Sequence, residues 1–322
     1  MRPRSIITAI LLVIGVCLFG HATLASDAGF SDKRTFWKPL LKWPAECGEW
    51  IAMREMSPDA GVEVHQLSPD RAVVVVTCDV AAYQMAYRAW SVERRAENVT
   101  ATPLFLPWGI KLGEARYGTA LLTGFFGLVD FPETGRMTVL TKGRGIGDCG
   151  TAAVYDVAGW IARLVSLRWQ KECDGKTTSE NWPITPADET ARANGPRTDE
   201  TAARALAITE DALPSVSWFA DTLQQSDFNC DGDADEILGG VEIPWDGPPS
   251  FVLAMVSGNK ASHWRFAINS ERQDALCGLD VRVEVSNPTA GQCPVISLDD
   301  GLCDRLHLTW DKATDTPRME RN

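Results

Sequence analysis

The stretch Ala72-Val73-Val74-Val75-Val76-Thr77 decides the fold class of this chain. Four consecutive β-branched residues are typical of a buried strand. Similar short runs recur along the sequence, separated by turn signals such as Glu133-Thr134-Gly135. Short strands joined by short turns predict antiparallel sheets. The expected strands are 72–77, 87–92, 120–128, 137–141, 152–155, 160–169, 236–243, 250–256, 264–268, 280–285 and 306–310.

A helix is expected before the first strands, because Trp43, Cys47, Trp50, Ile51 and Met53 recur at helical spacing. A proline near the start of this segment is tolerated in the first turn of a helix. The sequence therefore predicts a mainly β protein, with an α+β arrangement as the alternative.

A change in composition divides the chain near its middle. From residue 174 to about 211 the chain is rich in Thr, Ala, Asp, Glu and Asn and holds few large apolar side chains. This is typical of a polar linker, with one helical turn around 200–206. We therefore predict two antiparallel-sheet domains, each with its own disulfides. The predicted segments are a signal peptide at 1–25, a first domain at 26–185, a linker at 186–212 and a C-terminal β domain at 213–322.

The first residues have the three-part layout of a secretory signal. Arg2 and Arg4 form a basic start, residues 6–20 form an apolar core, and small residues lead to cleavage after Ala25. The apolar core is shorter than the roughly 18–20 residues of a spanning helix, which disfavours a retained membrane anchor. Cys17 lies inside the apolar core, which disfavours a lipoprotein signal. We expect a mature protein without a membrane span, in the periplasm or secreted.

The acidic charge limits the classes of partner. The chain has a formal net charge of −12 at pH 7, and about −14 without the two arginines of the leader. Such a surface repels nucleic acid and anionic membranes, so neither is an expected partner. Solubility, cation binding and attraction to a basic protein remain as explanations of the charge.

Eight cysteines remain once Cys17 leaves with the leader. An even number in an exported chain predicts disulfides, with four cysteines in each half. Three pairings are open within each half, and each bridge is expected to contribute about 2–4 kcal/mol. A zinc site is disfavoured, because the sequence lacks a CxxC or a Cys/His cluster of suitable spacing. The expected bridges are Cys47–Cys78, Cys149–Cys173, Cys230–Cys277 and Cys293–Cys303.

The segment Asp227-Phe228-Asn229-Cys230-Asp231-Gly232-Asp233-Ala234-Asp235 predicts a calcium loop. Asp227, Asn229, Asp231, Asp233 and Asp235 place oxygens at alternate positions, and a glycine at position 6 permits the sharp turn of such loops. The backbone carbonyl of Asp233 is a further candidate ligand. The glutamate of an EF-hand is absent at position 12, and the loop resembles those of FG-GAP and dockerin-type repeats. The alternative is a turn held by side-chain to backbone hydrogen bonds.

The segment Lys142-Gly143-Arg144-Gly145-Ile146-Gly147-Asp148-Cys149-Gly150 is rich in glycine. It lacks the GK[ST] ending of a phosphate loop, and a strand is expected after it where a phosphate site needs a helix. A structural loop is therefore expected. Arg144 and Asp148 remain candidates for an exposed recognition pair.

This glycine-rich segment also carries a resemblance to a known family. Together with residues downstream and upstream of it, the segment resembles the bacterial family of unknown function DUF1176 over about residues 36–185. The resemblance implies an exported, cysteine-containing protein and implies no activity. The other matching residues are Ala152, Ala153, Tyr155, Cys173 and Trp182-Pro183, with Cys47, Cys78 and Tyr83 upstream.

Catalytic constellations are sparse in this sequence. His263 beside Ser262 and His307 near Asp304 are fragments of a nucleophilic site, without an orienting group. Asp299-Asp300 is an acidic pair of the kind that glycosidases use, although one pair among 43 acidic residues carries little weight.

The function favoured by these observations is that of a non-catalytic binding or interaction protein. An inhibitor or immunity-type factor for an envelope enzyme is one form of it, because an acidic surface can meet a basic enzyme. The alternatives are a calcium-stabilised structural component of the envelope and a carboxylate-dependent envelope hydrolase. The expected partner is an envelope or secreted protein, and the expected ion is Ca²⁺.

Overall fold

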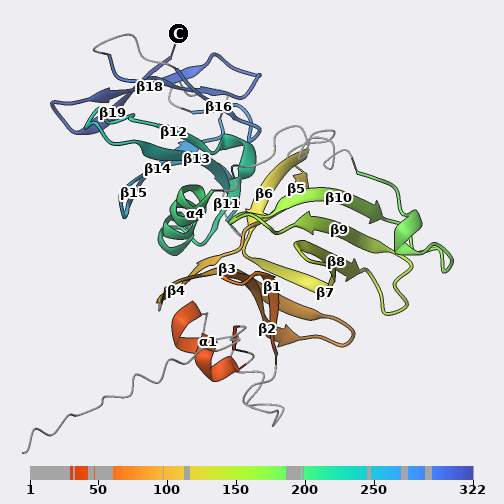
Figure 1. The fold of residues 1–322 in the computed structure, drawn as a ribbon. Coiled ribbons are helices and arrows are strands. Elements are labelled where there is room, and N and C mark those ends of the chain that lie inside the picture. Colours follow the sequence, from red (N-terminus) through yellow and green to blue (C-terminus); the bar gives the residue numbers. More distant parts are fainter. Residues whose placement is uncertain are drawn as a thin grey trace, which may run out of the picture.

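The computed structural model describes residues 30–31, 33–42, 47, 61–96, 98–111, 117–185, 197, 199–244, 248–269, 275–286 and 292–321. Strands make up 53% of these described residues and helices 11%, which confirms the predicted mainly β fold. The named strands form three sheets in which neighbours pair antiparallel (Figure 1).

The first sheet is formed by strands of the first half of the chain, in the order β1-β2-β3-β7-β8-β9-β10, with β4 beside β3. Its strands are β1 (Val62–Ser68), β2 (Arg71–Val80), β3 (Met85–Arg95), β4 (Asn98–Pro103), β7 (Gly124–Glu133), β8 (Arg136–Lys142), β9 (Gly150–Asp156) and β10 (Arg163–Gln170).

The second sheet takes strands from both halves, in the order β15-β14-β13-β11-β6-β5, with β12 beside β13. Trp218 and Phe219 of β11 pair with Leu121 and Ala120 of β6, so a hairpin of the first half extends a sheet of the second half. The strands are β5 (Leu106–Lys111), β6 (Tyr117–Leu122), β11 (Val216–Phe219), β12 (Gln224–Ser226), β13 (Asp235–Glu242), β14 (Ser250–Ser257) and β15 (Lys260–Ala267).

The third sheet and the helices complete the described fold. The sheet has the order β16-β17-β18-β19, formed by β16 (Arg282–Val285), β17 (Ile296–Asp299), β18 (Leu306–Asp311) and β19 (Thr316–Arg321). The helices are α1 (Arg34–Leu41), α4 (Glu200–Ala212) and the short 3₁₀ turns η1 (Ser179–Asn181) and η2 (Ala220–Thr222). No helix in these described ranges has the length and apolar character needed to cross a bilayer.

The valine run of β2 is buried on both faces of the first sheet. Val73 and Val75 pack into an inner core to which β3, β8, β9 and β10 also contribute. Val74 and Val76 pack on the other face, in a cluster with Trp37 of α1. Burial on both faces explains why the run lacks the polar alternation of a half-exposed strand.

The second sheet is covered on both faces. Leu238 and Val252 lie in one core cluster with Leu206 of α4. Ile237 and Leu253, the next residues along the same strands, lie in another cluster with residues of the third sheet. Because side chains alternate along a strand, α4 and the third sheet cover opposite faces, and Figure 1 shows the two on either side of β13 and β14.

One predicted strand is corrected by the structure. Residues 120–128, expected as one strand, end strand β6 and begin strand β7, which belong to different sheets. The break falls at Thr123, whose hydroxyl accepts a hydrogen bond from Arg88 and donates one to Glu210. The side chain at the break therefore joins β3, the β6–β7 junction and α4.

Helix α4 occupies the C-terminal end of the predicted linker. The side chain of Asp199 accepts a hydrogen bond from the backbone N–H of Ala202 at 2.9 Å and caps the helix. Ala202, Ala203 and Leu206 are buried, so the apolar face of the helix packs on the second sheet. The helix is longer than the single turn expected, and residues 186–196 lie outside the described residues. The domain boundaries stay a prediction.

The disulfides agree with two of the four expected pairings. Cys47–Cys78 and Cys149–Cys173 are formed as expected. In the second half, Cys230 pairs with Cys293 and Cys277 with Cys303, which corrects the expected pairs. The Asp300 carboxylate accepts hydrogen bonds from the backbone N–H groups of both Cys277 and Cys303, and thereby brings these two cysteines together.

Two further expectations concern the N-terminal region. The signal peptide and nearly all of the helix expected at 43–53 lie outside the described residues. Helix α1 lies just before that segment and was not expected. Its Trp37 is fully buried, and the indole N–H donates to the Ser31 carbonyl at 2.6 Å.

Candidate functional site

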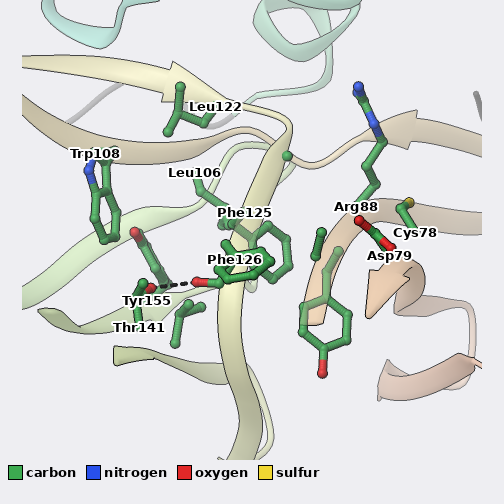
Figure 2. A pocket seen from close by; sticks show the side chains of 14 residues that line it. Cys78, Asp79, Arg88, Leu106, Trp108, Leu122, Phe125, Phe126, Thr141 and Tyr155 are labelled. Atoms are coloured by element: carbon green, nitrogen blue, oxygen red, sulfur yellow. Dashed lines mark hydrogen bonds between the residues drawn. The ribbon is translucent and has the colours of Figure 1, made fainter. Parts of the chain in front are cut away.

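An apolar pocket of about 720 Å³ lies where the β5–β6 hairpin meets the first sheet. Aromatic side chains from four strands line it, and Figure 2 shows Trp108, Phe125, Phe126 and Tyr155 among them. Tyr87 and Phe125 stack with their ring centres 5.7 Å apart, and Trp108 of β5 also faces the cavity. The lining residues are Cys78, Asp79, Ala86, Tyr87, Arg88, Leu106, Trp108, Leu122, Gly124, Phe125, Phe126, Val139, Thr141 and Tyr155.

Two of the three hydroxyl groups in the described pocket lining, those of Tyr155 and Thr141, donate to backbone carbonyls of the protein. The buried Tyr155 hydroxyl donates to the Pro107 carbonyl at 3.1 Å, and burial raises the pKa of this phenol far above its ordinary value. The Thr141 hydroxyl donates to the Phe126 carbonyl. Both groups hold strands of the pocket wall together and leave its surface mainly apolar.

A polar network runs from the pocket to helix α4. Arg88, which lines the pocket, donates to the Thr123 hydroxyl at 3.0 Å, and that hydroxyl donates to Glu210 at 3.2 Å. Burial raises the pKa of Glu210, and the Thr123 hydrogen bond and the Arg88 charge lower it in part. The same three residues line a smaller polar cavity of about 210 Å³. The network therefore fixes one wall of the pocket to the second half of the chain.

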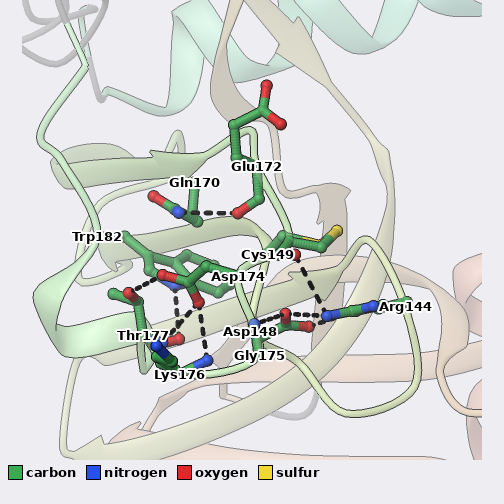
Figure 3. Close-up of polar contacts among 11 residues, drawn as sticks. Arg144, Asp148, Cys149, Gln170, Glu172, Asp174, Gly175, Lys176, Thr177 and Trp182 are labelled. Carbon is green, nitrogen blue, oxygen red and sulfur yellow. Dashed lines mark hydrogen bonds and ion pairs between the residues drawn. A yellow bond between two sulfur atoms is a disulfide. The ribbon is translucent and has the colours of Figure 1, made fainter.

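The glycine-rich segment forms the loop between β8 and β9, and its two charged candidates pair with each other. Arg144 donates from Nε to the Asp148 carboxylate at 2.7 Å, and a second guanidinium nitrogen also donates to it. The backbone N–H of Gly175 donates to the same carboxylate at 2.5 Å. These bonds, the Arg144 bond foremost, hold the pKa of Asp148 far below its ordinary value. Figure 3 shows the network beside Cys149.

Glycine at position 150 is required by the backbone of this loop. Gly150 has φ of +133°, and a Cβ there would lie 2.0 Å from the Thr141 carbonyl oxygen. Cys149, bonded to Cys173, ties the loop to the segment that follows β10. Asp148, Cys149 and Cys173 form a compact group of potential metal ligands, but the sulfurs are joined in a disulfide and do not offer thiolates. The arrangement is that of a structural loop.

The segment 227–235 forms an exposed loop between β12 and β13. Its polar side chains accept hydrogen bonds from backbone N–H groups of the loop. The N–H of Asp231 donates to the Asp227 carboxylate at 3.0 Å, and the N–H of Asp233 donates to the Asp231 carboxylate at 2.8 Å. Cys230 and Gly232 have φ of +56° and +100°, so the chain turns sharply at both. Phe228 is fully buried and lies 5.6 Å from the ring of Trp310. Phe228 therefore anchors the loop in the core between the second and third sheets.

Asp235, at the end of this loop, is the buried member of the predicted ligand set. Its side chain is fully buried, and its Oδ2 accepts from the N–H groups of Phe228 and Asn229 at 3.0 and 3.3 Å. Among the residues that the structure describes, its Oδ1 has no hydrogen-bond partner of normal geometry. Burial raises the pKa of this carboxyl, although these N–H groups and the nearby Ser257 hydroxyl lower it in part.

The fragments of a nucleophilic site do not assemble as expected. His263 contacts Arg265 at 2.8 Å, and it is the neighbour of Ser262 along a strand, where adjacent side chains point to opposite faces. His307 contacts Ser297 through Nδ1 at 2.9 Å, a pairing across the third sheet that the sequence did not indicate.

The acidic pair Asp299-Asp300 has a structural role in the fold. Asp299 pairs with Arg305 at 2.8 Å. Asp300 is buried, which raises its pKa, but four backbone N–H groups donate to it and bring the pKa below its ordinary value. Its carboxylate is fully occupied in holding two loops together.

Sequence reasoning missed the apolar pocket. Its lining comes from β2, β3, β5, β6, β7, β8 and β9, so no local pattern identifies it. The adjacent rings Phe125-Phe126 are a local signal of such a surface. Neighbouring side chains of a strand point to opposite faces, so one of the two rings must lie outside the inner core.

These features define an antiparallel β protein with four disulfides. Residues 34–187 match the family model described as "Protein of unknown function (DUF1176)". The resemblance predicted from the glycine-rich segment is thereby confirmed for this region.

One relative is the uncharacterized protein YpfG of Escherichia coli (strain K12). It is 28% identical over 122 residues, which are 38% of this chain and 34% of the relative. The matched region thus spans about a third of that protein's length. The likeness of residues 227–235 to FG-GAP and dockerin loops stays a prediction.

A solved structure of a post-proline cleaving enzyme from Rickettsia typhi also matches. The match has 11% identity and covers 80% of this chain and 27% of that one. Its TM-score is 0.18, so it carries no argument about fold or activity.

Proposed function

We propose that the protein is a non-catalytic binding protein and that the pocket between the β5–β6 hairpin and the first sheet holds its ligand. The observation that carries the proposal is the pocket itself, with a volume of about 720 Å³ and a wall rich in aromatic rings. Pockets of roughly 300–1,000 Å³ with mainly apolar walls are typical of small-molecule sites.

The wall favours a ligand with an apolar body. Trp108, Phe125, Phe126 and Tyr87 present rings, and Leu106 is one of the aliphatic side chains between them. Aromatic rings contribute large contact areas and stack on flat ligands. The polar side chains Asp79 and Arg88 carry opposite charges, which favours a small molecule of low net charge.

The side chains of the pocket favour binding over hydrolysis. A carboxylate-dependent glycosidase needs two carboxyl groups about 5–10 Å apart, whereas Asp79 is the one carboxylate among the described lining residues. The hydroxyl of Tyr155 in the lining already donates to a backbone carbonyl. The lining therefore offers shape and apolar contact, with little acid–base chemistry.

Four disulfides favour an oxidising compartment, which agrees with the expected export to the periplasm or outside the cell. In that compartment the ligand is a small apolar molecule of the envelope. An envelope or secreted protein remains the expected macromolecular partner, and inhibition of an envelope enzyme is the form of interaction that the acidic charge favours.

The test uses N-phenylnaphthylamine, a neutral aromatic probe whose fluorescence rises in apolar surroundings. We expect saturable binding at one site of the full protein, with energy transfer from tryptophan. Gly124 lines the pocket, and a Cβ there meets nothing closer than the Tyr87 carbonyl oxygen at 3.9 Å. Gly124→Leu should therefore fill the pocket without a backbone clash and weaken probe binding by about tenfold or more.

Gly145→Leu is the matched control, because a Cβ at Gly145 also has its nearest contact at 3.9 Å and the residue lies outside the pocket. It should bind the probe like the unmodified protein. Equal loss in both variants, or the absence of saturable binding, would contradict the proposed site. Turnover of peptidoglycan or of an ester panel by the purified protein would contradict the non-catalytic role.

A further inference from the structure

The carboxylate of Asp235 is buried in the protein without a cationic partner. Its side chain is fully buried, and Oδ1 has no hydrogen bond of normal geometry to any part of the chain that the structure describes. Most buried polar atoms in folded proteins have such a partner, so an unsatisfied carboxylate oxygen needs an explanation.

The charges around Asp235 do not compensate it. The charged group that acts on it is another carboxylate, that of Asp231. Within the described part of the chain, no Lys, Arg or His forms an ion pair with Asp235. A buried charge beside a like charge is unfavourable unless a cation or a proton neutralises it.

The side chains that precede Asp235 add oxygens to the same turn. The side chains of Asp227, Asn229 and Asp231 already accept hydrogen bonds from backbone N–H groups of the loop. Each carboxylate or amide oxygen has a second lone pair that these hydrogen bonds leave unused. The turn thus collects several hard oxygen donors around one buried carboxylate.

We propose that residues 227–235 bind a calcium ion, independently of the pocket. The side chains of Asp227, Asn229, Asp231 and Asp235 and the backbone carbonyl of Asp233 are the ligands. Calcium takes six to eight oxygens in flexible geometry, whereas magnesium demands a strict octahedron. The carboxylates of the loop do not yet lie within 4.8 Å of one another as a group, so the ion draws them together. The sulfur of Cys230 is held in a disulfide and offers no thiolate to zinc.

The backbone of the loop is anchored at three points, so calcium has to reorder mainly the side chains of the loop. Phe228 is buried in the core shared with the third sheet, Cys230 is bonded to Cys293, and Asp235 begins β13. Pre-organisation of this kind lowers the entropy lost on binding. Calcium at this position strengthens the attachment of the loop to the second and third sheets.

The test is a titration of the full protein, freed of metal with a chelator, with calcium chloride in a calorimeter. We expect one site with a dissociation constant of about 10⁻⁵–10⁻³ M, and much weaker binding of magnesium. The melting temperature should rise with calcium concentration in the same range, because a ligand that binds only the folded state stabilises it.

Two matched variants separate the loss of a calcium ligand from the loss of negative charge in the loop. Asp231→Asn removes a ligand carboxylate from an exposed residue and should weaken calcium binding by about tenfold or more. Asp233→Asn removes the same charge from the same exposed loop, but its proposed ligand is the backbone carbonyl. Its affinity should stay within about threefold of that of the unmodified protein.

Asp235→Asn tests the buried carboxylate directly. In chelator the variant should melt no lower than the unmodified protein, because it loses an uncompensated charge, and calcium should no longer raise its melting temperature. The proposal is overturned if the unmodified protein shows no heat and no thermal shift at about 10⁻² M calcium. It is also overturned if Asp231→Asn and Asp233→Asn lose the same affinity.

Discussion

Two loops of this protein carry the polar motifs of the sequence, and their buried carboxylates differ in how many hydrogen-bond and ion-pair partners they have. In the loop at 142–150, Asp148 receives two bonds from Arg144 and one from the backbone of Gly175. In the loop at 227–235, Asp235 receives two backbone bonds, and within the described residues its other oxygen has no hydrogen bond of normal geometry and no cation pairs with it. A motif whose charges are satisfied internally indicates architecture, whereas an unsatisfied buried charge indicates a ligand.

The largest effect is expected from the backbone of the 142–150 loop. Gly150→Ala should lower the free energy of unfolding by about 3 kcal/mol or more, because its Cβ would clash with the Thr141 carbonyl at a φ of +133°. Urea denaturation measures the loss. Gly145→Ala, where a Cβ has room, should change stability by less than about 1 kcal/mol. Equal stability of the two variants would show that the loop does not need this backbone conformation.

Removal of the disulfide of either loop should have an intermediate effect on stability. Replacing both cysteines by serine, at Cys149 and Cys173 or at Cys230 and Cys293, should cost about 2–4 kcal/mol of stability in either case. Only the second pair should also weaken the calcium response, because it frees the 227–235 loop from residue 293. The melting temperature with and without calcium measures both effects. A loss of the calcium response in the first pair would contradict the division of roles.

The smallest effect is expected from the charge of Asp148. Its folded-state pKa lies below the ordinary value of 3.8, so its contribution to stability is present above that pH and is lost as the pH falls below it. Asp148→Asn should therefore be less stable than the unmodified protein at about pH 7, and the difference should shrink at about pH 3. Denaturation at both pH values measures it. A difference that does not depend on pH would contradict the ion pair with Arg144.

The strands could be predicted where the sequence signal is local. The valine run of β2, the strand pattern of β8 and β9 and the resemblance around Gly143–Gly150 each depend on neighbouring residues. The break at Thr123 could not be predicted, because it depends on the distant Arg88 and Glu210. The pairing of β6 with β11 joins residues about a hundred positions apart, and no local pattern encodes it.

The candidate sites could also be predicted only where neighbouring residues define them. The oxygen-rich spacing of 227–235 is visible in the sequence, but the burial of Asp235 depends on β13 and the sheets around it. The pairing of Cys277 with Cys303 depends on the Asp300 carboxylate, which holds both backbone N–H groups. The apolar pocket gathers side chains of seven strands, so it exists only in the folded protein.

The most direct test of the contrast between the two loops is hydrogen–deuterium exchange of the full protein in chelator and in calcium. The backbone amides of residues 227–235 should exchange more slowly in calcium, while those of residues 142–150 keep the same rate. Unchanged exchange at 227–235, or equal protection of both loops, would contradict the claim that one loop is satisfied internally and the other by a cation.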